Sequence, residues 1–189
     1  MARVRYLDID DLPEESRWLF ERLQAGRGSV GNVFRALAHH PAGLRGFMVL
    51  GTAILDRGTL DPRLRELAII RTGQLCGATY EVAHHEAIAR RLGVPEEKIG
   101  NLANWDHTAL YTPEERAVIR YAEVVTRDVV VPDELFERVR SFLDERGTVE
   151  LTLAVAFYNL VSRFLVAMQV ELEPSFASTA DEQASDRRV

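Results

Sequence analysis

Apolar residues recur every three to four positions along most of the chain, and no segment alternates strictly between apolar and polar side chains. One such group is Leu19, Phe20 and Leu23. A spacing of three to four residues places side chains on one face of an α-helix, whereas strict alternation is typical of a β-strand. The pattern therefore predicts an all-α fold, with about seven to nine helices in a single domain.

Helix-start signals divide this pattern into segments. Asp61 stands before Pro62, and Thr112 with Glu115 forms a capping box, in which each side chain can accept a backbone N–H of the first turn. Thr148 stands before the longest apolar run and fits the start of a further helix. The helices predicted from these signals cover residues 13–25, 29–38, 41–56, 61–75, 77–92, 95–103, 113–127, 132–145 and 148–171.

The helical pattern covers residues 1–173, with its core at residues 40–130. From residue 174 to residue 189 the side chains are small, polar or charged, so this tail cannot bury enough apolar area to offset the entropy lost on ordering. We expect the tail to be mobile unless a neighbouring subunit holds it.

Composition narrows the class of protein. Hydrophobic residues make up 47% and charged residues 28% of the 189 residues, as in ordinary globular proteins, and a net charge of -6 argues against a nucleic-acid partner. One cysteine cannot form an internal disulfide, and the first residues lack the apolar stretch of a signal peptide, so a cytoplasmic location is expected. Residues 151–170 could span a bilayer by length, but they include Asn159 and Arg163, which favours a buried core helix.

The stretch from residue 74 to residue 93, QLCGATYEVAHHEAIARRLG, carries the main chemical candidates. Helical geometry puts Glu81 and His85, four residues apart, within an apolar stripe that also contains Ala78, Val82, Ile88, Ala89 and Leu92. Burying a charge or an unpaired imidazole costs several kcal/mol unless it has a partner. The pair therefore either satisfies itself or faces a pocket, and it is a candidate site.

A second carboxylate lies on the preceding helix, which is apolar nearly all round. Glu66 falls on the same face as Gly73, whose missing side chain leaves space for a close neighbour or a ligand. We expect Glu66 to meet Glu81 and His85 across an antiparallel helix pair, so that three titratable groups share one cavity. The alternative for Glu66 is a structural ion pair with an arginine such as Arg71 or Arg163.

The other polar residues of this stretch give weaker signals. Cys76 lies almost opposite His85 on a helix that begins at residue 77, and a lone cysteine is most often a small apolar filler. His84 points in a more polar direction than His85, so the two histidines do not converge as metal ligands would. Neither a metal nor another cofactor is expected.

Residues 63–93, RLRELAIIRTGQLCGATYEVAHHEAIARRLG, resemble the core of the carboxymuconolactone decarboxylase and alkylhydroperoxidase D (AhpD) superfamily. Its peroxidase branch has the pattern E-x11-C-x2-C-x3-H, and counting from Glu66 places these positions at Ala78, Glu81 and His85. The glutamate and histidine match, but both redox cysteines are missing. Residues 80–85, YEVAHH, are similar instead to decarboxylase-like members.

The resemblance implies an AhpD-like helical fold that assembles into homo-oligomers (dimers, trimers or hexamers), with sites near subunit contacts. The function that follows is a carboxy-lyase in which His85 transfers protons to a small anionic organic substrate, assisted by Glu66 and Glu81. Lactone decarboxylation or a related reaction would fit. Two alternatives remain open, an AhpD-like thiol peroxidase that uses Cys76 and a non-catalytic oligomeric binding protein.

Candidate substrate contacts are also found among residues other than Glu66, Glu81 and His85. Asn159 and Arg163, one turn apart, could hold a substrate carboxylate by a forked contact, or they could be satisfied within the protein. Trp105 could wall the pocket, and Tyr80 stands beside Glu81. His107 is more simply interpreted as part of a surface turn.

Overall fold

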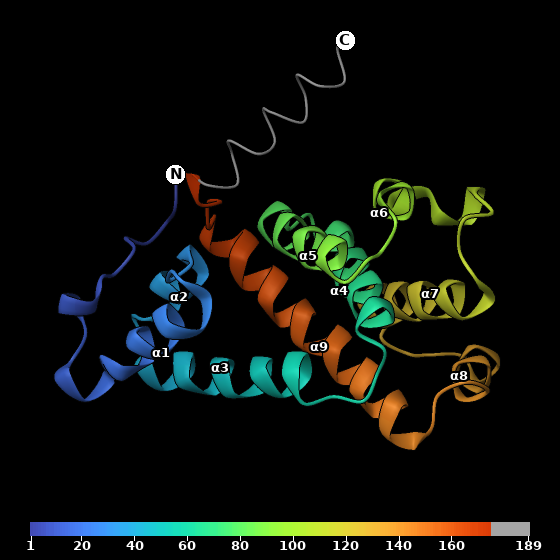
Figure 1. Cartoon of the computed structure of the whole chain (residues 1–189), viewed down its shortest axis with the longest axis horizontal. Helices are drawn as coiled ribbons and strands as arrows, with labels where there is room; N and C mark the ends of the chain where they lie inside the picture. The colour runs from blue at the N-terminus through green and yellow to red at the C-terminus, as the bar shows by residue number, and fades with distance from the viewer. Residues whose placement is uncertain (175–189) are drawn as a thin grey trace, which may run out of the picture. The chain divides into compact units, whose positions relative to one another are not determined.

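The computed structural model describes residues 1–174, and all of its regular elements are helical (Figure 1). Nine α-helices and three short 3-10 helices are present in that part of the chain, so the predicted all-α fold class is confirmed. Within it the residues form two compact units, Met1–Leu50 with the chain from Met168 onward, and Gly51–Ala167. Apart from residue 174, the tail predicted to be mobile lies outside the described residues.

The first unit holds the short elements of the N-terminal region. These are η1 (Ile9–Asp11), η2 (Glu14–Ser16), α1 (Trp18–Arg27), α2 (Asn32–Leu37) and the first part of α3 (Pro41–Asp56). The backbone N–H of Asn32 donates to Glu173 Oε1 (2.6 Å), and Arg3 N–H donates to the carbonyl of Met168 (2.9 Å). Residues from the two ends of the described chain are thereby joined within one unit.

The second unit contains the end of α3, α4 (Pro62–Cys76), α5 (Thr79–Arg91), α6 (Glu96–Asn101), η3 (Leu102–His107), α7 (Pro113–Arg127), α8 (Asp133–Arg140) and α9 (Glu145–Met168) up to Ala167. Helix α4 is its centre and packs against α5 and α7 (Figure 1). Residues 65–73 of α4 are all buried, as expected of a helix that is apolar nearly all round. The polar side chains within this span must therefore find partners inside the protein.

Local sequence signals explain most helix boundaries. The Asp61 carboxylate accepts the N–H of Arg63 (2.8 Å), and Thr112 with Glu115 forms the predicted capping box at the start of α7. Several boundaries differ from the prediction by up to five residues, and the two largest differences lie at the first helix and between α8 and α9. The first predicted helix begins instead with the 3-10 turn η2 and becomes α-helical only at Trp18.

The second difference lies between α8 and α9. Helix α8 ends at Arg140 rather than at residue 145, and α9 begins at Glu145 rather than at Thr148. The Asp144 carboxylate accepts the N–H of Gly147 (2.7 Å) and therefore acts as the cap, while the Thr148 hydroxyl bonds back to the Asp144 carbonyl (2.9 Å).

Helix α9 is long and apolar enough to cross a membrane by length and composition alone. Half of its most apolar window is buried within the protein, as expected of a core helix with one exposed side. Its buried residues include Leu151, Val155, Tyr158 and Leu165, which lie on one face of the helix.

Candidate functional site

A tight helical hairpin creates the candidate site. Helix α4 ends at Cys76, and Gly77 follows in the left-handed conformation (φ 68°), which glycine adopts without the cost imposed on other residues. Helix α5 then begins at Thr79. A Cβ on Gly73 would lie 3.1 Å from Val82 Cγ2, so the two helices approach closely, as predicted from that glycine.

Glu66, Glu81 and His85 meet across this hairpin. His85 Nδ1 lies 2.5 Å from Glu66 Oε2, and His85 Nε2 lies 2.8 Å from Glu81 Oε1. All three residues are buried: Glu66 is 0% exposed, Glu81 is 5% exposed and His85 is 4% exposed. Each ring nitrogen thus faces one carboxylate, and both can donate at once only when the imidazole is protonated.

The electrostatic surroundings favour that protonated form. Burial lowers the pKa of His85, but the hydrogen bonds and negative charges of Glu66 and Glu81 more than compensate, and the pKa is raised from 6.5 to about 9. His85 is therefore a buried imidazolium at neutral pH, held between two carboxylates.

Arg65 completes the charge balance. Its Nε and Nη2 donate to Glu66 Oε1 at 3.1 and 3.0 Å, and its Nη1 donates to the Leu55 carbonyl at 2.9 Å. Arg65, Glu66, His85 and Glu81 form a row of alternating charge whose formal sum is zero when His85 is protonated. We call these four residues the charge row.

Sequence reasoning did not anticipate Arg65, because adjacent residues on a helix point about 100° apart and do not normally face each other. It proposed Arg71 or Arg163 as the partner of Glu66, and the structure gives both of them other partners. The sequence did contain one signal for Arg65, because it is a charged residue next to Glu66 inside the nearly all-apolar α4.

The aromatic ring of Tyr158 in α9 packs edge-on against His85, with 4.6 Å between ring centroids. The ring of Tyr80 stacks on His84 instead, with centroids 4.5 Å apart. Tyr158 is a contact of His85 that sequence reasoning missed, since its position in the apolar α9 marks it only as a core residue.

Residues 41–124, which include Glu66, Glu81 and His85, match the carboxymuconolactone decarboxylase family. The protein YdfG of Bacillus subtilis (strain 168), described as uncharacterized, is 34% identical over 114 residues, which are 59% of this chain and 78% of that protein. The chain belongs to the carboxymuconolactone decarboxylase family. YnjA of Escherichia coli (strain K12), also described as uncharacterized, is 31% identical over 125 residues, or 65% of this chain and 68% of that protein.

Solved structures agree with this placement. An uncharacterized peroxidase-related protein of Ralstonia eutropha JMP134, with an alkylhydroperoxidase AhpD core, superposes with a TM-score of 0.82 at 25% identity. That match covers 93% of this chain and 94% of the other. The apo debrominase Bmp8 superposes with a TM-score of 0.78 at 20% identity, over 94% of this chain and 95% of that chain, which is a likeness of fold.

The single thiol of this family member lies outside the charge row. Cys76 is the last residue of α4 rather than part of α5, and its Sγ donates to Asn159 Oδ1 at 3.7 Å. The same amide oxygen accepts a hydrogen bond from Arg163 Nη1, and Asn159 Nδ2 donates to Thr126 Oγ1 at 3.0 Å. Asn159 and Arg163 thus bind each other, and the amide connects the thiol to α9.

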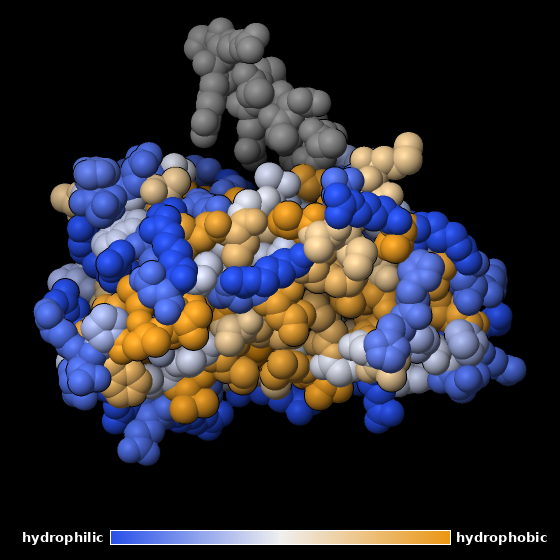
Figure 2. Space-filling view, turned by 180° about the vertical axis from the view of Figure 1, so that it is seen from behind, coloured by the Kyte–Doolittle hydropathy of each residue, from blue (hydrophilic) through white to orange (hydrophobic). Residues whose placement is uncertain are grey.

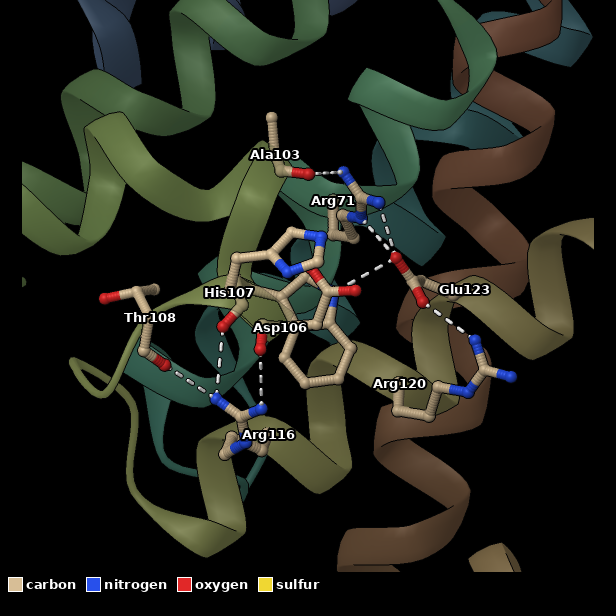
Figure 3. Close-up of polar contacts among 9 residues, drawn as sticks. Arg71, Ala103, Asp106, His107, Thr108, Arg116, Arg120 and Glu123 are labelled. Atoms are coloured by element: carbon tan, nitrogen blue, oxygen red, sulfur yellow. Dashed lines mark hydrogen bonds and ion pairs between the residues drawn. The ribbon is translucent and has the colours of Figure 1, made fainter.

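Trp105 belongs to a second polar cluster, centred on the buried Glu123, which Figure 3 labels together with Arg71 and Arg120. Its Nε1 donates to Glu123 Oε1 at 3.1 Å, and the same carboxylate accepts Arg71 Nη2 at 2.5 Å and Arg120 Nη1 at 3.1 Å. Burial raises the pKa of the Glu123 carboxyl, but these donors outweigh it, and the pKa lies below its ordinary value. We call Arg71, Trp105, Arg120 and Glu123 the tryptophan cluster.

His107 and a possible metal site are the remaining candidates from the sequence. The side chain of His107 is 83% exposed beside Asp106, in agreement with the predicted surface turn. In the part of the chain that the structure describes, no group of three or more His, Cys, Asp or Glu side chains is arranged to hold a metal ion.

Proposed function

We propose that this chain is a carboxymuconolactone decarboxylase-like enzyme that transfers a proton to a small anionic organic substrate, with lactone decarboxylation as the representative reaction. The observation that supports the proposal is the contact of 2.8 Å between His85 Nε2 and Glu81 Oε1 at the end of the charge row. A general acid must hold its proton at the working pH, and a His85 pKa of about 9 meets that condition.

The residues of the charge row have different roles in this proposal. Glu66 orients the imidazolium by accepting from its Nδ1, and Arg65 in turn fixes Glu66 by donating to the other carboxylate oxygen. Glu81 is the member at the other end of the row, and its Oε1, which takes the proton from His85 Nε2, is the oxygen that would pass that proton to the substrate. His85 supplies the proton and Glu81 passes it on.

The chemical step can then be written in full. The carbon–carbon bond to the substrate carboxylate breaks, carbon dioxide leaves, and the electron pair spreads into the lactone ring. The proton held between His85 and Glu81 forms the new carbon–hydrogen bond, and water returns a proton to the pair. Proton transfer of this kind contributes about 10²–10⁴-fold to rate.

An anionic substrate also needs a positive partner, because the charge row is neutral in total. We propose Arg163 with Asn159 for this role, since the two are already joined and Asn159 is next to Tyr158, which contacts His85. Tyr80 stays a proposed contact beside Glu81. Trp105 is held by Glu123 in the tryptophan cluster and is not part of this proposal.

The test is turnover of γ-carboxymuconolactone, followed by ultraviolet absorbance, for the wild type and for Glu81→Gln, His85→Gln and Cys76→Ser. We expect Glu81→Gln and His85→Gln to lower kcat by about 10²–10⁴-fold. Cys76→Ser should leave kcat within about twofold, since the thiol lies outside the charge row. Unchanged helicity by circular dichroism is the control for folding.

Other outcomes would separate the alternatives. A wild type without turnover would reject this substrate. Loss of hydroperoxide reduction in Cys76→Ser, with Glu81→Gln still active, would favour a thiol peroxidase. Tight binding of the lactone without turnover, unchanged in His85→Gln, would favour a binding protein.

A further inference from the structure

A groove lies between α8 and the first half of α9. It has a volume of about 590 Å³, and its apolar walls are formed by four exposed residues, Phe136, Val149, Leu153 and Ala156. Figure 2 shows that hydrophobic side chains also gather at the surface on one face of the molecule. Sites for small molecules are concave, mostly apolar and about 300–1,000 Å³ in volume, so the size and the lining of the groove fit such a site.

Two threonines in the lining of the groove are already engaged by the protein. Thr148 Oγ1 donates to the carbonyl of Asp144 at 2.9 Å, and Thr152 Oγ1 donates to the carbonyl of Thr148 at 2.8 Å. The hydroxyl of Tyr121 lies 2.8 Å from Thr152 Oγ1. Because each threonine hydroxyl carries one proton, neither threonine has a donor left for a ligand.

Arg140 supplies the groove with a positive charge. The residue is half-buried, and its Nη1 donates to the carbonyl of Leu143 at 2.9 Å. Within residues 1–174 no carboxylate forms an ion pair with this guanidinium, whereas the nearby Arg138 pairs with Glu134 at 2.9 Å. The bond to Leu143 fixes the guanidinium of Arg140 and leaves its other N–H groups for an anion.

Glu145 is the carboxylate in the lining of the groove, and it is exposed. An exposed carboxylate keeps its hydration, so pairing it with a cation gains little free energy. Arg140 is half-buried beside apolar side chains, where an ion pair is stronger than it is in water. The groove therefore favours a ligand with a negative charge at Arg140 over a ligand with a positive charge at Glu145.

We propose that the groove binds a small amphipathic anion, a carboxylic acid with an aliphatic or aromatic body. The body of this ligand covers the exposed side chains of Phe136, Val149 and Leu153, and its carboxylate accepts hydrogen bonds from Arg140. A neutral apolar compound would leave the guanidinium without a counter-charge. An inorganic anion would leave the apolar walls in water, so only a ligand that combines both parts matches the whole groove.

The groove is separate from the charge row, because it opens on the opposite side of α9. Tyr158 is the residue of α9 that contacts His85. With 3.6 residues per turn, Val149 and Ala156 point about 180° and about 160° away from Tyr158 around the helix. The body of α9 therefore stands between the groove and His85, and binding in the groove does not depend on the proposed reaction.

Isothermal titration calorimetry of the full chain with decanoate tests the proposal. We expect saturable binding of one decanoate per chain, about tenfold tighter than decanol or decylamine, which carry the same alkyl body without the negative charge. Arg140→Gln should weaken decanoate about tenfold and leave decanol unchanged, and Glu145→Gln should tighten decanoate by about twofold. The matched control is Arg138→Gln, at an arginine of α8 that already has a partner, and it should keep the wild-type Kd. Absence of saturable decanoate binding, decanol binding as tight as decanoate, or equal effects of the two arginine changes would each overturn the proposal.

A steric change tests the location independently of charge. Ala156→Trp places an indole in the groove and should weaken both decanoate and decanol by about tenfold or more, with unchanged helicity because residue 156 is exposed. The matched control is Leu160→Trp, one turn further along α9 at a residue that is 55% exposed and outside the groove. It should keep the wild-type Kd. Decanoate binding that Ala156→Trp leaves unchanged would place the ligand elsewhere and overturn the proposal.

Discussion

Two buried charged clusters share helix α4 and differ in one respect that decides their chemistry. The tryptophan cluster gathers two arginines and an indole N–H around the single carboxylate of Glu123. The charge row places one imidazole between two carboxylates, with Arg65 behind them. The carboxylates of both clusters are buried and hydrogen-bonded, so burial of charge does not distinguish a site from a structural ion pair.

What differs is the ability to exchange a proton. An arginine guanidinium stays protonated in proteins, and the lowered pKa of Glu123 keeps its carboxylate ionised, so no member of the tryptophan cluster changes charge near neutral pH. His85 has a pKa of about 9, so it can lose its proton at a mildly alkaline pH. The charge row can therefore act as a proton carrier, and the tryptophan cluster is a means of fastening α4, η3 and α7 together.

The largest effect on stability is expected in the tryptophan cluster. Glu123→Ala leaves the buried Arg71 guanidinium without its counter-charge and the Trp105 N–H without its acceptor, which should lower the free energy of unfolding by about 3–5 kcal/mol. The matched control is Arg120→Ala, which removes a 53% exposed partner of the same carboxylate and should cost less than about 1 kcal/mol. Urea unfolding measures both, and equal losses would contradict the structural role assigned to Glu123.

A pH series separates the clusters further. The folded-state pKa of His85 is raised above its unfolded value of 6.5, so its contribution is fully present below pH 6.5 and is lost as the pH rises through about 9. We expect the free energy of unfolding to fall by on the order of 3 kcal/mol over that window. His85→Gln should remove this slope, whereas His107→Gln, at an exposed histidine, should keep it. A wild-type slope that persists in His85→Gln would exclude His85 as its source.

The sequence predicts those features of the fold that depend on local interactions. Helices α3 and α7 match their predicted bounds, and in α7 the cap formed by Thr112 and Glu115 lies within one turn of the helix. The α8–α9 boundary was wrong because Asp144 and Thr148 are both good capping residues, and only the packed chain decides between them.

The candidate site likewise has some contacts that follow from local sequence and others that depend on the packed chain. The approach of Glu66 to Glu81 and His85 follows from helical periodicity and from Gly73, and the structure brings the three together. The pairing of Arg65 with its neighbour, and of Trp105 with Glu123, depends on side-chain directions across several helices. Periodicity specifies the face on which a residue lies, but it does not specify which of several buried partners that residue meets.

The smallest of the expected effects tests how closely the charge row depends on the helical hairpin. In Gly73→Ala the new Cβ would meet Val82 Cγ2 of α5 at 3.1 Å, so Val82 must give way by a few tenths of an ångström. We expect a loss of about 1–3 kcal/mol in the free energy of unfolding, as for overpacking elsewhere. The hydrogen bond from His85 in α5 to Glu66 in α4 joins the same two helices. Weakening this bond should lower the pKa of His85, and the pH at which stability declines should shift downward with it.

Gly100→Ala is the matched control for this change, since Gly100 is a helical glycine with no atom within 4 Å of an added Cβ. It should leave stability unchanged or raise it by up to about 1 kcal/mol, with the pH dependence of the wild type. The tryptophan cluster joins α4 to η3 and α7, so an adjustment at Val82 of α5 should spare it, and the fluorescence of Trp105 should stay constant in Gly73→Ala. A Gly73→Ala variant with the wild-type pH dependence would show that Glu66 keeps its hydrogen bond to His85 when the added methyl group is accommodated, and that the charge row is set by its own hydrogen bonds rather than by the close approach of the helices.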